Sequence, residues 1–497
     1  MEPTLEQIQD FKGKYPKQLY LLFFTEMWER FTFYGMRALL VLFMTSQLKF
    51  DDAKSNLTYG AYQSLIYAMP VFGGMIADRL LGQRKSILWG GILIAIGSFV
   101  LVIPNTLSFF IGMGIIIVGN GYFKPNISTI VGSLYSKDDN RRDAGFSLFY
   151  MGINLGSLLG GLLCGYVGQE INWHLGFGIA GVFMVVGLFV FMKGQKMLGP
   201  IGLAPAPEKL KEKTAVGINK EMVTYIISIL SIPLFVFILY HYDIYSYIIN
   251  PFGIVALVYV LYISFKEGKE AFLKILVALI LTIFSSLFWA FYEQGGGSLN
   301  LFTDRNVNLN FFGFHLSSAS LNNSINGGMV VAFSPVFAWL WLWLAARKAE
   351  PNSAIKFALA LVQLGLGFYM LVLGKSFAGP DGRIPLIFFV LGYIFMTWGE
   401  LCISPIGLSA ITKLSPPKMV GLMMGMWFLA SSYGQYLAGW IGALMAIPAE
   451  GNESVSGWQS LNVYSDGYGK IALISIICGV FLFILSPWLK KMMKDVH

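Results

Sequence analysis

Fourteen long apolar segments run through the chain, and they constrain its fold more than any other feature. A helix needs about 20 mostly apolar residues to cross the hydrocarbon core of a bilayer. The segments lie near residues 18–48, 56–79, 86–104, 107–133, 144–169, 173–193, 222–240, 248–265, 272–298, 315–346, 354–374, 384–412, 418–447 and 467–489. The sequence therefore predicts an all-α polytopic membrane protein with fourteen transmembrane helices.

The composition excludes the soluble alternatives. Charged residues make up 12% of the 497 residues and hydrophobic residues 56%, whereas a soluble domain carries about a quarter charged residues. A chain this long with so few ionic groups could not cover its surface with them and stay in water. We therefore expect a lipid bilayer as its main surroundings.

Basic residues are distributed unevenly between the loops. Of the 35 lysines and arginines, 26 fall on the side of the two termini, six on the other side and three inside the spans. Cytoplasmic loops carry the positive excess, so both termini are predicted to be cytoplasmic. The net charge of +8 is then a topology signal, and we expect no nucleic-acid partner.

A polar segment divides the fourteen spans into six, two and six. Residues 194–220 contain Pro200, Pro205 and Pro207 and a cluster of Glu and Lys, which is typical of a solvated linker. The predicted organisation is a six-helix bundle over 1–193, a linker with two inserted helices over 194–271, and a second six-helix bundle over 272–497. The inserted helices carry no buried charge, which favours a packing role.

Seven ionisable residues lie well inside the predicted spans. Each costs roughly 2.5–3.5 kcal/mol to insert at mid-bilayer unless it is paired or faces a wet cavity. They are Glu26, Glu29, Arg30, Arg37, Lys124, Glu293 and Glu400. One such pair could be a structural lock, but seven charges in both halves favour a transport pathway.

The first span concentrates these charges on one side. At 100° per residue, Glu26, Glu29, Arg30, Tyr34 and Arg37 fall within an arc of about 140°. The remaining positions supply a face for lipid or for packing. A helix with one charged stripe is expected to line a cavity.

The balance of buried charge favours coupling to protons. Four acids and three bases carry −1 when all are ionised, so uptake of one proton makes the set neutral, the state that a low-dielectric cavity favours. A zwitterionic substrate would leave this balance unchanged. The sequence shows no metal-ligand spacing and no nucleophile–base pair, so we expect a protein that is not an enzyme and has no cofactor other than the coupling proton.

Glycine recurs every four residues in the span 144–169. Gly152, Gly156 and Gly160 form a small-xxx-small pattern, which in membrane helices usually marks close helix packing. We interpret these three positions as a packing face.

Six motifs carry a resemblance to a known family. They are EMWERFTFYG at 26–35, DRLLGQR at 78–84, GYFKPN at 121–126, FYMGINLGSL at 149–158, FWAFYEQ at 288–294 and GELCISP at 399–405. Together they resemble the proton-dependent oligopeptide transporters (the POT or PTR family, bacterial type) of the major facilitator superfamily. Phe33 stands where that family has the first tyrosine of its motif, so this hydroxyl is missing here.

The resemblance implies a fold and an activity. The fold is that of the major facilitator superfamily, with two six-helix bundles and two inserted helices. The activity is proton-coupled symport, importing di- and tripeptides by alternating access across the bacterial plasma (inner) membrane. We expect a monomer.

The resemblance also assigns roles to residues. Proton coupling falls to Glu26, Glu29 and Arg30, and recognition of the peptide carboxylate to Arg37 and Lys124. Recognition of the peptide amino terminus falls to Glu400, Asn154 and Asn326. Tyr34, Tyr67, Trp289 and Trp427 are assigned to the side-chain pockets, and Ser404 is a further substrate-binding residue. Glu293 is assigned as a gate that pairs alternately with Arg37 and Lys124.

Three alternatives remain open at this point. A drug–proton antiporter would lack the Arg37 and Lys124 pair facing Glu400. A carrier of a nitrate-like anion would leave Glu400 without a role. A peptide sensor that binds without transporting is compatible with every residue named above.

Overall fold

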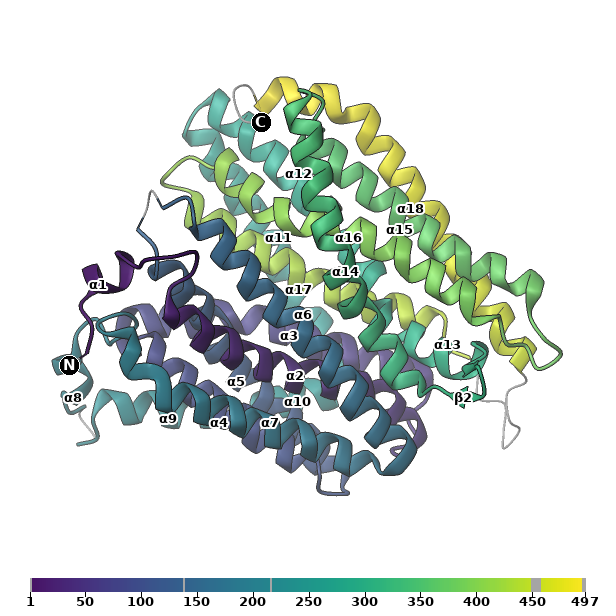
Figure 1. Cartoon of the computed structure of the whole chain (residues 1–497), viewed down its shortest axis with the longest axis horizontal. Coiled ribbons are helices and arrows are strands. Elements are labelled where there is room, and N and C mark those ends of the chain that lie inside the picture. Colours follow the sequence, from purple (N-terminus) through teal and green to yellow (C-terminus); the bar gives the residue numbers. More distant parts are fainter. Residues whose placement is uncertain (1, 137–138, 215–216, 448–456, 494–497) are drawn as a thin grey trace. The chain divides into compact units, whose positions relative to one another are not determined.

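The computed structural model describes residues 2–136, 139–214, 217–447 and 457–493 and is built almost wholly of helices (Figure 1). Eleven helical segments of this described part are long and apolar enough to cross a membrane. Three more long helices, α2 (Lys17–Ser46), α4 (Gln83–Val100) and α17 (Val420–Leu444), coincide with the other predicted spans. The predicted all-α polytopic fold is confirmed.

The chain divides into two compact units. The N-terminal unit comprises Met1–Leu40, Leu65–His241 and Ala319–Gly327. Besides most of α2 and all of α4, its elements are α1 (Leu5–Gln9), α3 (Asp52–Ile76) from Leu65 onward, η1 (Ala77–Leu81), α5 (Thr106–Ser133), α6 (Arg142–Tyr166), η2 (Val167–Ile171), α7 (Trp173–Gly194), η3 (Gln195–Leu198), α8 (Pro207–Lys211), α9 (Lys220–Leu230) and α10 (Ile232–Tyr240).

The C-terminal unit comprises Val41–Ser64, Tyr242–Ser318 and Gly328–His497. In it α15 and α18 run side by side (Figure 1). Besides α17, its elements are α11 (Tyr242–Lys266), α12 (Lys269–Tyr292), η4 (Glu293–Gly296), α13 (Ser298–Asn306), β1 (Asn310–Phe311), β2 (Phe314–His315), most of α14 (Ser318–Ala346), α15 (Ser353–Gly374), η5 (Lys375–Phe377), α16 (Leu386–Leu414) and α18 (Gly457–Met493).

Asparagine side chains mark the starts of several spans. The Oδ1 atom of Asn105 accepts a hydrogen bond from Leu107 N, at 2.8 Å, at the start of α5. Asn172 does the same for α7, Asn219 for α9 and Asn352 for α15. These caps satisfy backbone N–H groups that have no partner inside the helix. The chain therefore starts these helices at the edges of the apolar runs.

The glycine face of α6 that the sequence predicts to pack closely does so, and its partner is α2. A Cβ atom added to Gly152 would lie 2.9 Å from Phe23 Cδ2, and one added to Gly160 would lie 2.9 Å from Phe31 Cα. Real Cβ atoms do not approach other atoms so closely. Glycine at these positions lets the two backbones meet, and this contact positions the helix that carries four of the seven charges predicted inside the spans.

Two helix segments pack with distant parts of the sequence. In the C-terminal unit, Ser64 Oγ donates to Ser432 O at 2.7 Å and Ser432 Oγ donates to Ser64 O at 2.8 Å. In the N-terminal unit, the start of α14 packs on α6, where Ser320 Oγ donates to Leu162 O at 3.0 Å. Small residues and hydroxyls make both contacts, as is common between membrane helices.

The inserted helices divide between the units. In the N-terminal unit, Trp89 Nε1 of α4 donates to Ser228 Oγ of α9 at 2.9 Å, and Lys85 pairs with Glu221 at 2.6 Å. In the C-terminal unit, Tyr245 Oη of α11 lies 2.8 Å from Ser64 Oγ of α3, the serine that also contacts α17. Hydrogen bonds and an ion pair thus anchor α9 and α11 within their units, and the packing role stays a prediction.

We predict that Gly160→Ala destabilises the protein, because the new methyl group meets the backbone of α2. Overpacking of this kind costs about 1–3 kcal/mol. The matched control is Gly178→Ala on α7, where the nearest atom would lie 3.5 Å away and the gain in helix propensity of about 1 kcal/mol remains. Thermal unfolding in detergent, followed by tryptophan fluorescence, should show a lower midpoint for Gly160→Ala alone. Equal midpoints for the two variants would contradict the close packing.

Candidate functional site

Helix α2 packs on α7 through the side opposite its charged residues. The rings of Trp28 and Phe183 stack with centroids 4.7 Å apart, and Thr32 Oγ1 donates to Ala180 O at 2.7 Å. Phe31 is buried against Phe183 as well. The apolar positions of α2 thus form a packing face, and the acids and bases point elsewhere within the unit.

Glu26, Glu29 and Arg30 form a buried ion triad. Each is at most 4% exposed. Arg30 Nε lies 3.1 Å from Glu26 Oε1, one helical turn away, and also pairs with Glu29. Two carboxylates therefore share one guanidinium, and the fully ionised triad carries −1.

Asn120 of α5 completes the surroundings of this triad. Its Nδ2 donates to Glu29 Oε1 at 3.3 Å. Glu26 Oε2 and Arg30 Nη2 are buried without a hydrogen-bond partner among the described protein residues. A buried polar atom left in this state costs about 1–3 kcal/mol. The triad can therefore lower its free energy by contacting another polar group.

Aromatic rings lie beside Lys124 and Arg37, the two predicted substrate-binding cations of the N-terminal unit. Lys124 Nζ of α5 is 4.0 Å from the centroid of the Tyr67 ring of α3, and Arg37 Cζ is 5.7 Å from that of Tyr34. Both cations are half-buried. The faces of these rings attract a cation. They also offer apolar contact area that can pack against side chains of different shapes.

Phe33 contacts the triad through its ring. The Arg30 guanidinium lies 5.1 Å from the ring centroid. A phenyl ring can make this contact as a phenol ring would, so the departure from the family motif removes a hydroxyl and keeps a cation–π partner.

The two asparagines expected at the peptide amino terminus lie in the N-terminal unit. Asn154 is buried on α6 and donates through Nδ2 to Tyr150 O at 3.0 Å. Asn326 lies in the segment Ala319–Gly327 of α14 that belongs to this unit. The next residue, Gly327, packs on α6 so closely that a Cβ there would lie 3.1 Å from Asn154 O. The fold thus brings these two segments together.

Glu400 and Glu293 are the buried acids of the C-terminal unit. Tyr292 Oη donates to Glu400 Oε2 at 2.6 Å, joining α12 to α16. Glu293 follows Tyr292 directly at the start of η4 and is buried. Trp289 packs edge-on to Tyr292 with ring centroids 5.4 Å apart. The motif at 288–294 therefore contributes a carboxylate, a hydroxyl and two aromatic rings.

Ser404 and Trp427 lie on neighbouring helices of the same unit. Ser404 is one turn beyond Glu400 on α16, and its buried Oγ has no hydrogen-bond partner in the described chain. The Trp427 ring of α17 lies against Gly407 of α16, where a side chain would collide with it. The predicted site residues are thus divided between the two units, and the roles given to them stay predictions.

Sequence reasoning missed two polar residues of this arrangement. Asn120 lies in a Gly-Asn-Gly triplet one helical turn before Lys124, and Tyr292 precedes Glu293. For Asn120, the spacing of four residues from the predicted charge Lys124 is the signal that could have indicated it; Tyr292 contacts Glu400, 108 residues away, and carries no such local signal. Both are neutral, so a search for buried charge passes over them.

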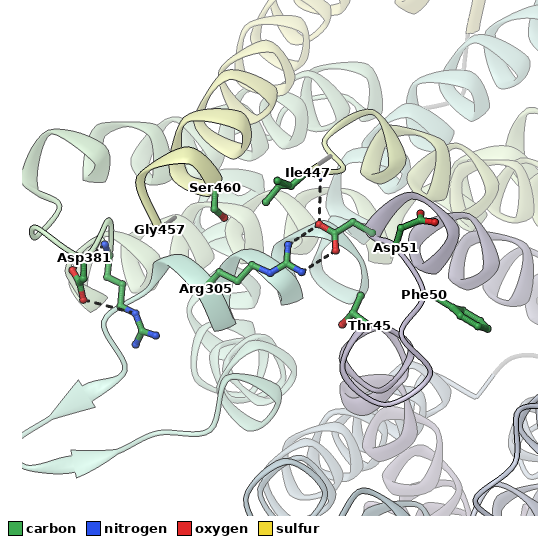
Figure 2. A pocket seen from close by; sticks show the side chains of 10 residues that line it. Thr45, Phe50, Asp51, Arg305, Asp381, Ile447, Gly457 and Ser460 are labelled. Carbon is green, nitrogen blue, oxygen red and sulfur yellow. Dashed lines mark hydrogen bonds and ion pairs between the residues drawn. The ribbon is translucent and has the colours of Figure 1, made fainter. Parts of the chain in front are cut away.

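A separate pocket of about 620 Å³ lies in the C-terminal unit (Figure 2). Arg305 crosses it and pairs with Asp52 through both nitrogens, Nη1 to Oδ2 at 2.6 Å and Nη2 to Oδ1 at 2.8 Å. Ile447 N donates to the same carboxylate at 3.5 Å. None of the site residues predicted from the sequence lines this pocket, and we give it no part in their site.

Comparison with known proteins agrees with the motifs. The model of the POT family matches residues 84–458. The uncharacterized transporter YclF of Bacillus subtilis is 37% identical over 97% of this chain and 96% of that protein. The peptide transporter YePEPT of Yersinia enterocolitica is 33% identical over the same shares of the two chains.

Solved structures are similar over almost the whole chain. The crystal structure of a peptide transporter POT in complex with sulfate superposes with a TM-score of 0.83, at 33% identity, over 99% of this chain and all of that one. A tetrameric PepTSo2 superposes with a TM-score of 0.82, at 29% identity, over 96% of this chain and 99% of that one. Because the family model covers most of the sequence and the buried motifs and the fold agree with it, the chain belongs to the POT family of membrane transporters.

Proposed function

We propose that this protein is a proton-coupled symporter that imports di- and tripeptides by alternating access. The observation that carries the proposal is the buried triad of Glu26, Glu29 and Arg30, in which two carboxylates share one guanidinium. Related proteins with 33% identity are named as peptide transporters. A peptide substrate fits the charged and aromatic residues of both units.

The triad provides a physical basis for coupling. Protonation of either Glu26 or Glu29 removes one of the two negative charges that hold Arg30. Arg30 or Arg37 is then freed from its internal acid and can meet the carboxylate of the substrate. Proton binding and peptide binding therefore favour each other, a reciprocity that any linked pair of equilibria must obey.

Peptide recognition follows from the chemistry of the two ends of a peptide. Arg37 offers a forked donor suited to a carboxylate, and Lys124 a second positive charge. Glu400, with Asn154 and Asn326, offers oxygens for an ammonium group. The aromatic residues Tyr34, Tyr67, Trp289 and Trp427 provide contact area for variable side chains, and Ser404 adds a hydroxyl.

The gate is proposed to involve Glu293, pairing alternately with Arg37 and Lys124. Ion pairs that form in one conformation and break in the other bias the equilibrium between the two. We further propose that the protein lies in the bacterial plasma membrane as a monomer. Both termini are proposed to be cytoplasmic, since the basic residues are concentrated in the loops on the same side as the termini.

The central experiment is uptake of labelled di-alanine into proteoliposomes with an inside-alkaline pH gradient. We expect accumulation against the peptide gradient that stops when an ionophore collapses the pH difference. Accumulation indifferent to the ionophore would refute proton coupling. Binding of di-alanine without accumulation would favour a sensor, and transport of nitrate or a drug in its place would identify a different carrier.

Glu26→Gln or Glu29→Gln should abolish gradient-driven uptake, because the amide cannot exchange a proton. Counterflow exchange of labelled for unlabelled peptide needs no net proton movement and should persist. Glu208→Gln is the matched control, since the Glu208 side chain is exposed in the linker. Driven uptake at the control level in both site variants would contradict the assignment.

Arg37→Ala should raise the apparent KM for di-alanine by about ten- to hundredfold, the value of one charge-assisted hydrogen bond. The KM for di-alanine amide, which lacks the carboxylate, should change much less. Arg142→Ala removes an exposed arginine at the start of α6 and should change neither value. Equal increases for both substrates would exclude a carboxylate role for Arg37.

A further inference from the structure

A second cavity of the C-terminal unit lies at its lysine-rich end. It has a volume of about 840 Å³ and is bounded by the last turns of α14, α16 and α18 and by the first turn of α15 with the loop before it. Sites for small organic groups occupy roughly 300–1,000 Å³. The cavity shares no residue with the pocket of Figure 2 or with the predicted peptide-binding residues.

The ionisable residues that line this cavity favour an anion. They are four lysines and one glutamate, namely Lys348, Glu350, Lys356, Lys413 and Lys490. Glu350 Oε1 lies 2.6 Å from Lys356 Nζ, so this acid is matched by a lysine that is itself buried. The lining therefore carries an excess of three positive charges, which come from the ends of three different helices.

The backbone adds to this positive field. Helix α15 begins at the cavity, and Asn352 caps it by accepting from Ile355 N at 3.0 Å. The amino-terminal end of a helix attracts anions through its N–H groups and its dipole. Ser353 and Ser409 line the same space and can donate hydrogen bonds to oxygen. Lysine and hydroxyl donors together with the helix dipole suit a phosphate oxygen.

Two exposed tryptophans indicate the depth of the cavity in the membrane. Trp343 precedes Lys348 by five residues at the end of α14, and Trp488 precedes Lys490 by two residues on α18. Trp488 is 71% exposed and Trp343 40%, and the guanidinium carbon of Arg347 lies 3.6 Å from the centroid of the Trp343 ring. Exposed tryptophans of membrane proteins concentrate at the level of the lipid headgroups, so the cavity opens at that depth.

Exposed apolar side chains are also present on the helices that bound the cavity. Leu342 on α14 and Ile484 on α18 are strongly exposed, and Leu414 and Met493 line the inner wall. A soluble anion would gain nothing from this surface. A lipid, which joins a charged headgroup to acyl chains, can use both parts.

We propose that this cavity binds the phosphodiester headgroup of an anionic phospholipid, with its acyl chains along α14 and α18. Basic pockets between transmembrane helices are sites of this kind. The leaflet is the cytoplasmic one under the orientation proposed above. The inference does not depend on which substrate the protein carries.

The test compares Lys413→Gln/Lys490→Gln with the wild-type protein in bilayer nanodiscs of equal parts phosphatidylcholine and labelled phosphatidylglycerol. The full-length protein is extracted into mild detergent, and the retained lipids are measured by mass spectrometry. The matched control is Lys269→Gln/Lys491→Gln, which removes two exposed lysines that do not line the cavity. Thermal unfolding of each variant checks that it is folded.

The wild-type protein and the control should retain phosphatidylglycerol over phosphatidylcholine. The cavity variant should bind phosphatidylglycerol about 30-fold more weakly, which corresponds to about 1 kcal/mol for each lysine lost. Equal retention of the two lipids by the wild type, or equal loss in both double variants, would overturn the proposal. Displacement of the lipid by millimolar inorganic phosphate would also overturn it, because the site would then belong to a soluble anion.

Discussion

Two carboxylates and one guanidinium share one side of α2, and the packing of the N-terminal unit has to accommodate them. Charges in a low-dielectric interior are tolerated only with partners, so Glu26, Glu29 and Arg30 restrict what can surround them. Asn120 of α5 supplies a hydrogen bond to this group, and the ring of Phe33 supplies a face for the cation. With both acids ionised, this group carries one uncompensated negative charge, which buried surroundings disfavour.

Close backbone contact is what makes such an interior possible. The glycine face of α6 brings that helix against α2, and serine hydroxyls join α3 to α17 and α14 to α6. Contacts of this kind depend on packing and hydrogen bonds more than on the hydrophobic effect, because lipid tails are as apolar as the side chains. They hold helices firmly without requiring large interlocking side chains.

The sequence predicted the helices well because crossing a bilayer demands a long apolar run. The span expected at 107–133 is α5, Thr106–Ser133. Helix α18 begins ten residues earlier than expected, at residue 457, and α13 with the small hairpin was missed, because these parts are short or polar.

Prediction of the site was less complete, because not every polar residue there carries a charge. Glu26 and Arg30 followed from their spacing of four along one helix. Tyr292 was missed because a neutral side chain carries little insertion penalty. The pair of Asp52 with Arg305, which lies in the separate pocket outside the predicted site, was missed because 253 residues separate its members.

The division of the inserted helices has a mechanical consequence. Helices α9 and α10 pack within one unit and α11 within the other, and the chain passes from the first set to the second at His241 and Tyr242. The inserted pair is therefore anchored in two separate places, α9 through Trp89 and α11 through Tyr245. The turn at His241 and Tyr242 is therefore the covalent link between two helices that are anchored in different units.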